Sequence, residues 1–170
     1  IKGKGQNVTL LHMTSSTNDA IAIAGVFGAS INNCFCYDFG IYRSSAGTAG
    51  TGISLAYTGV AKIRDVHISD MQLGMSMLCA TNTIAERVLA TYTIGSTNGF
   101  YGFSLDCSGS GPNGNASSVF RDCWASSAGA GGSGHIGFYV RGNYVSDLIF
   151  DACETASTHI GFYFDCSTSL

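Results

Sequence analysis

Acidic side chains give this sequence its clearest prospect of chemistry, and there are only 11 of them among 170 residues. Two groups stand out as candidate pairs: Asp38 with Asp70, and Asp151 with Glu154. Two carboxylates about 5–5.5 Å or about 6.5–9.5 Å apart can act as acid and base or nucleophile in breaking a glycosidic bond. These four are the candidate catalytic residues, and the alternative is that they are ordinary solvated surface acids.

Aromatic and imidazole side chains form a second candidate set. The phrase HIGFYV at 135–140 recurs as HIGFYF at 159–164, which places His135 with His159 and Tyr139 with Tyr163, all expected to face outward. Trp124 is the only tryptophan. Aromatic faces pack on the apolar faces of sugars while polar groups bond their hydroxyls, so these five are glycan-binding candidates. A ladder of stacked identical residues or a subunit interface would equally explain the paired histidines and tyrosines.

A repeated strand pattern must position these residues. Six segments share a small residue with apolar residues at the first and third positions after it. They are AIAIAG from Ala20, GISLAY from Gly52, GMSMLC from Gly74, GFSLDC from Gly102, GFYVRG from Gly137 and GFYFDC from Gly161. Period-two alternation predicts strands, and these apolar positions are predicted to fill the core.

A second, weaker motif precedes each copy of the first. It is centred on Val8, Cys34, Val66, Val88, Cys123 and Cys153. The shortest unit holding both motifs is about 22 residues, enough for three short strands and three turns. Aligning the units places Asp38 and Asp70 at equivalent positions, and Trp124 opposite Glu154. Valine and cysteine share the central position of this motif, which indicates that the thiols act as small apolar core residues.

Stacked units of this kind predict an all-β parallel β-helix of about six coils, in which each coil buries its apolar face against its neighbours. We treat residues 1–170 as a single β-helix segment. The sequence begins without Met and ends just after an inner strand, so we expect it to be part of a longer chain.

The coil pattern resembles the right-handed single-stranded β-helices of the pectate-lyase-like superfamily. The opening IKGKGQNVTLL resembles the early coils of bacteriophage tailspikes. The resemblance implies a homotrimer on a virion tail, assembled in the host cytoplasm, that recognises a bacterial surface polysaccharide. It leaves open whether the glycan is also cleaved. The alternatives are a structural shaft without catalysis, and a secreted bacterial polysaccharide lyase or glycoside hydrolase.

Composition argues against several other classes of protein. Only 11% of residues are charged and the net charge is −3, which disfavours nucleic-acid binding. No apolar run approaches the roughly 20 residues that cross a membrane, so we expect no membrane insertion. Cys34 and Cys36 form a lone CxC, and no acidic cluster suits calcium. We therefore predict no metal and no cofactor.

Overall fold

The computed structural model describes residues 1–26, 28–44, 49–93, 99–107, 115–127, 134–142 and 145–165, with Asn115 described by its backbone alone. Within these ranges the regular secondary structure is β-strand throughout, with no helix. The prediction of an all-β chain is confirmed. The repeat pattern also predicts a core position for Cys166, in the column of Cys79 and Cys107, and this residue falls outside the described residues.

The strands form two main sheets. The larger contains β1 (Leu10–Met13), β3 (Cys34–Arg43), β5 (Ala61–Ser69), β7 (Thr83–Tyr92), β10 (Val119–Arg121), β11 (Trp124–Ser127), β14 (Ile149–Asp151) and β15 (Glu154–Ala156). The smaller contains β2 (Ile21–Ala24), β4 (Thr51–Ala56), β6 (Leu73–Leu78), β8 (Tyr101–Cys107), β12 (Ile136–Gly142) and β16 (Ile160–Asp165). A short pair, β9 (Asn115–Ala116) and β13 (Val145–Ser146), completes the set.

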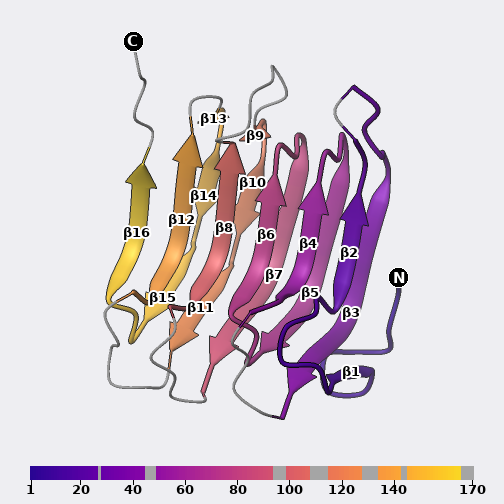
Figure 1. Cartoon of the computed structure of the whole chain (residues 1–170), viewed down its shortest axis with the longest axis vertical. Coiled ribbons are helices and arrows are strands. Elements are labelled where there is room, and N and C mark those ends of the chain that lie inside the picture. The colour runs from indigo at the N-terminus through magenta and orange to yellow at the C-terminus, as the bar shows by residue number, and fades with distance from the viewer. Residues whose placement is uncertain are drawn as a thin grey trace.

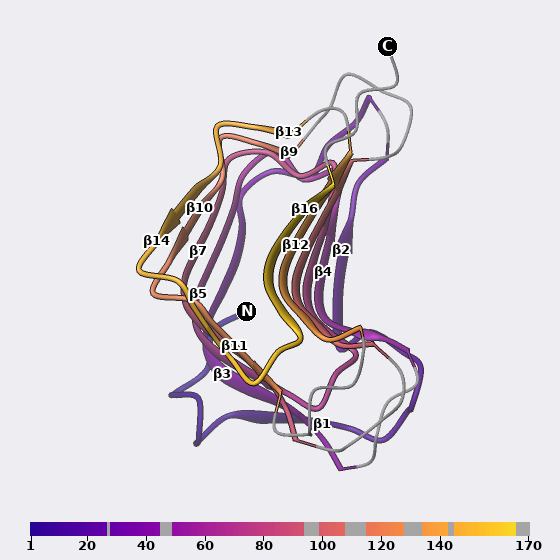
Figure 2. The same cartoon turned by 90° about the vertical axis from the view of Figure 1, so that its left-hand side faces the viewer.

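The chain passes alternately between the two main sheets, with β10 and β11, and likewise β14 and β15, serving as the two halves of one pass through the larger sheet, and all strand pairs within the sheets are parallel. Figure 1 shows the chain advancing steadily across the molecule, and Figure 2 shows the two sheets facing one another with their strands stacked. Ile53 pairs with Met75, 22 residues later, so the shortest repeat has the predicted length. This arrangement is compatible with a parallel β-helix.

The core lies between the sheets, where the first motif predicted it. Its first-position residues stack in one column, in the order Ile21, Ile53, Met75, Phe103, Phe138 and Phe162. Phe138 is fully buried and its ring stacks on both Phe103 and Phe162, with centroids 4.6 Å apart in each case. Phe162, in the last described repeat, remains 39% exposed. Burial thus depends on having a neighbouring repeat on each side.

The small residue of the first motif has a steric cause. A Cβ at Gly102 would collide with the Ala125 side chain and with the Gly137 carbonyl oxygen, and Gly137 meets Thr155 and Gly161 in the same way. At these glycines the smaller sheet lies so close to β11 and β15 of the larger sheet that no side chain fits between the backbones. Glycine is retained because the backbones must come together there.

From β3 onward, the segment that each repeat contributes to the larger sheet bends at one residue in the left-handed conformation. The bend residues are Asp38, Asp65, Arg87, Asp122 and Ala152, with φ between 50° and 60°. Cys34 lies before the bend and pairs with Ala61, whereas Val66 directly follows the bend and lies beside Phe39. The predicted alignment of the second motif is therefore correct for Val66, Val88, Cys123 and Cys153 but wrong for Cys34. It is also wrong for Val8, which is 71% exposed.

Candidate functional site

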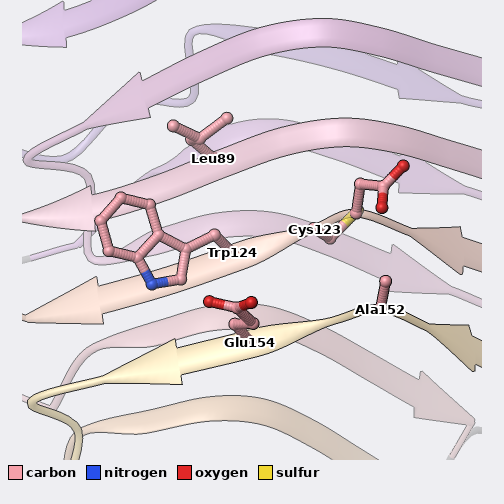
Figure 3. Close-up of a pocket in the computed structure, with 6 residues that line it drawn as sticks. Leu89, Cys123, Trp124, Ala152 and Glu154 are labelled. Carbon is pink, nitrogen blue, oxygen red and sulfur yellow. The ribbon is translucent and has the colours of Figure 1, made fainter.

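An aromatic–acidic pocket lies on the outer face of the larger sheet, just after the bend. Register places Leu89 of β7, Trp124 of β11 and Glu154 of β15 side by side in one outward column, so the predicted pairing of Trp124 with Glu154 is confirmed. The pocket has a volume of about 290 Å³, and Asp122, Cys123 and Ala152 complete its lining. Figure 3 shows the indole of Trp124 and the carboxylate of Glu154 emerging from adjacent strands toward the same hollow.

The geometry of this pocket suits a sugar ring. Trp124 is 38% exposed, which leaves part of its ring surface open, while Glu154 offers carboxylate oxygens that accept hydrogen bonds from hydroxyl groups. An apolar surface beside a few fixed polar groups is the usual composition of a small-molecule site.

Asp122 is a pocket residue that sequence reasoning missed. It lies at the bend, one strand from Glu154 and two residues away along the strand direction, which corresponds to a backbone separation of about 8 Å. A separation of roughly 6.5–9.5 Å between carboxyl groups is typical of inverting glycosidases. The available signal was its position directly before Cys123 in the second motif, which aligned it with the other bend residues.

Asp151 belongs to a different structure, a network of ion pairs before the bend. Its carboxylate accepts a hydrogen bond from Arg121 Nε at 3.0 Å. The same corner contains a two-pronged contact of Arg87 with Asp65, at 2.6 and 3.0 Å. The hydrogen bond from Arg87 holds the pKa of Asp65 below its ordinary value. Asp151 thus stands in a ladder of surface charges rather than beside Glu154 in the pocket.

The predicted pairing of Asp38 with Asp70 is wrong. The strand register sets Asp38 beside Asp65, and Asp70 lies just after the end of β5, beyond the pair of Tyr42 with Ser69. Asp70 is only 3% exposed, and its carboxylate accepts hydrogen bonds from Thr93 N (2.6 Å), Thr93 Oγ1 (2.8 Å) and Ser69 Oγ (3.0 Å). The pairing is wrong because Cys34, which pairs with Ala61, had been aligned with Val66. Asp70 is a buried residue whose hydrogen bonds to Thr93 link two neighbouring repeats.

His135 is also misplaced by the sequence prediction. It was expected on the surface, but it is 2% exposed and Nδ1 lies 2.6 Å from Ser127 Oγ. Its ring meets those of Tyr92 and Phe100 edge to face, so it packs as part of the core. His159 in the following repeat is exposed. The identical phrase therefore has different surroundings in its two copies, because His159 lacks a described repeat beyond it.

The tyrosines occupy a separate face, on the smaller sheet. Tyr139 and Tyr163 stack as predicted, with centroids 5.6 Å apart and planes 10° apart, and Tyr101 extends the group. Burial raises the pKa of Tyr139. This face lies on the other sheet from Trp124, so the five glycan-binding candidates do not form one site.

A second pocket, of about 190 Å³, lies in the same outward column as Trp124 but nearer the N-terminus. Gln6, Asn7, Tyr42, His67 and Ser69 line it together with apolar groups. His67 Nε2 lies 3.0 Å from Thr91 Oγ1, and burial lowers the pKa of the imidazole, an effect that the nearby Asp70 partly offsets. Sequence reasoning placed His67 near a candidate acid but did not find this pocket, because its N-terminal side comes from an irregular segment.

The cysteines within the described ranges are free thiols, and all except Cys153 are buried, in keeping with their predicted use in the core. No group of three or more His, Cys, Asp or Glu that could hold a metal ion occurs among the described residues. No described segment forms a helix able to cross a membrane. Comparisons of the chain with protein-family models, curated proteins and solved structures gave no match in any of the three.

Proposed function

We propose that the chain is a right-handed parallel β-helix of the pectate-lyase-like type, and that it binds a bacterial surface polysaccharide at the Trp124 pocket. The observation that carries the proposal is the placement of a partly exposed indole beside Glu154 over a hollow between adjacent repeats. A partly exposed indole leaves apolar surface in contact with water, and covering that surface is favourable. A sugar ring has an apolar face that can cover it.

Hydrolysis of the bound glycan is the second candidate function, favoured by Asp122. Asp122 and Glu154 both line the pocket with a backbone separation of about 8 Å, and carboxyl groups on this spacing can adopt the roughly 6.5–9.5 Å distance of inverting enzymes. In that mechanism one carboxyl protonates the leaving oxygen while the other activates a water molecule on the opposite face of the ring. Asp38, Asp70 and Asp151 take no part in this proposal, because Asp70 and Asp151 are engaged elsewhere and Asp38 does not reach the pocket.

The same proposal places the chain in a homotrimeric tailspike on a virion, and the tyrosine face of the smaller sheet is a candidate contact between subunits. Stacked Tyr139 and Tyr163 offer the aromatic surface that is common in protein interfaces. A purely structural shaft would use the same fold but would bind no glycan at the Trp124 pocket. Measuring glycan binding therefore distinguishes a tailspike that recognises a polysaccharide from a structural shaft.

The test exploits the single tryptophan. Bacterial capsular and O-antigen polysaccharides are titrated into the protein while Trp124 emission is followed, and calorimetry is repeated on Trp124→Ala. A bound sugar should change the emission, and the variant should lose about tenfold in affinity, a change of about 1.4 kcal/mol. Phe35→Ala is the matched control, since Phe35 is an exposed aromatic on the same sheet, outside the pocket.

The outcomes are distinct. Failure of every polysaccharide to bind would favour the structural shaft and overturn the proposal. For cleavage, release of new reducing ends should disappear in Glu154→Gln while Trp124 emission still responds to the glycan. Release that continues unchanged in this variant would exclude Glu154 as the acid or base.

A further inference from the structure

We propose that the ligand of this face is an uncharged linear oligosaccharide that lies across the repeats, from the Trp124 pocket to the Tyr42 pocket. The inference rests on the proposed glycan binding and adds to it the chemical class, the direction and the second half of the site.

The two pockets share one continuous outer column. Strand register runs without a break from Gly40 through His67, Leu89 and Trp124 to Glu154. His67 lines one pocket and Leu89 lines the other, so the pockets meet at neighbouring residues of the column. They are best understood as two ends of one surface.

A parallel column of hydroxyl groups flanks this surface. It consists of Tyr42, Ser69, Thr91 and Ser126, again paired in unbroken register. Tyr42 is 42% exposed, and His12 stacks on its ring with centroids 5.5 Å apart. The surface therefore carries an aromatic side chain near each end, with hydroxyl, amide and imidazole groups between and beside them. This composition matches a ligand with many hydroxyls and apolar ring faces.

The spacing of the repeats suits an extended glycan. Adjacent strands lie about 4.8 Å apart, so the column from Gly40 to Glu154 spans about 19 Å. The strand spacing is close to the rise of one pyranose residue in an extended chain. An oligosaccharide along the column would consequently place about one sugar over each repeat.

The charge of the surface selects an uncharged ligand. Asp122 and Glu154 contribute carboxylates, and no Lys or Arg is among the described residues that line either pocket. A uronic acid polymer carries one carboxylate on each acidic sugar. These carboxylates would be repelled by Asp122 and Glu154, with no Lys or Arg among the described residues of the pocket lining to offset the repulsion.

The arginines of the neighbouring corner do not alter this conclusion. Arg64, Arg87 and Arg121 are each held by acids of their own ladder, with Arg64 and Arg87 on Asp65 and Arg121 on Asp151. Acids outnumber arginines across this part of the sheet, so the local field disfavours anionic polymers.

The first experiment is an array of immobilised bacterial polysaccharides whose repeating units are neutral, N-acetylated or rich in uronic acid. Hits confined to the neutral and N-acetylated polymers are expected. Preferential binding of the uronic acid polymers would overturn this inference while leaving glycan binding itself intact. An array without any hit would instead contradict the proposed function on which the inference stands.

The second experiment tests the direction along the column. Fragments of two and of six sugars from the best polysaccharide are measured against Trp124→Ala, Tyr42→Ala and the control Tyr163→Ala. Tyr42→Ala should weaken the hexasaccharide about tenfold and change disaccharide binding less, whereas Trp124→Ala should weaken both. A hexasaccharide that binds Tyr42→Ala as tightly as the unmodified protein would refute the extended site. A larger loss in Tyr163→Ala than in Trp124→Ala would move the site to the smaller sheet.

Discussion

Replacement of Asp70 provides the sharpest test of the distinction between a structural and a catalytic acid. In Asp70→Ala the Thr93 amide loses the carboxylate that accepts its hydrogen bond at 2.6 Å, and a donor left in this way costs about 1–3 kcal/mol. Alanine must also adopt the left-handed conformation seen at φ 62°, at about 1 kcal/mol or more. The free energy of unfolding should therefore fall by about 3 kcal/mol.

Asp70→Asn is the matched variant. Asparagine tolerates the left-handed conformation and keeps an oxygen for Thr93, so a loss of only about 1 kcal/mol is expected. Equilibrium urea unfolding followed by circular dichroism measures both values, with an unchanged dependence on urea as the sign of an intact folded state. Asp38→Ala imposes similar backbone strain at another acidic residue and serves as the control. If Asp70→Ala were as stable as the unmodified protein and had lost glycan cleavage, the structural assignment would be wrong.

Phe138→Ala should lower the free energy of unfolding in urea by about 3–5 kcal/mol, because the ring is fully buried. Phe162→Ala should lower it by less than half as much, because that ring is 39% exposed. Equal losses in the two variants would contradict the stacked core. The pKa of His67 is lowered in the folded state, so the unfolded chain binds the proton more readily, and stability should decline as pH falls below about 6.5. His67→Gln should flatten that decline while His159→Gln should not, and an unchanged pH profile in His67→Gln would exclude His67 as its source.

The sequence predicts the fold well where the pattern is strictly alternating. In the smaller sheet each strand has a simple period of two, and the register of Ile53 with Met75 and of Phe138 with Phe162 is confirmed. The larger sheet contains the left-handed residue at the bend, which changes the spacing of inward residues from two to three. Cys34, which precedes the break and pairs with Ala61, was aligned with Val66, which follows the break, so Asp38 was set against Asp70 instead of Asp65. Trp124 and Glu154 both follow the break and were aligned correctly.

Burial was harder to predict than register. His135 and His159 have the same sequence neighbours, and only the presence of a further packed repeat, together with the Ser127 hydroxyl, makes one of them a core residue. Asp122 was missed although it lies two residues before Trp124, because an alternating pattern does not reveal that the left-handed residue at the bend turns its side chain toward the pocket lining.

The outward columns of the larger sheet differ in a way that bears on function. Before the bend, Arg64, Glu86, Arg121 and Asp151 alternate in charge, and each can be neutralised by its neighbour within the protein. After the bend, the column passes through glycine, imidazole, leucine, indole and carboxylate, and this order does not pair each group with a complementary neighbour. A column that satisfies itself stabilises the stack of repeats. A column of unlike groups leaves hydrogen-bonding capacity and aromatic surface directed outward, which is the condition that a ligand-binding surface requires.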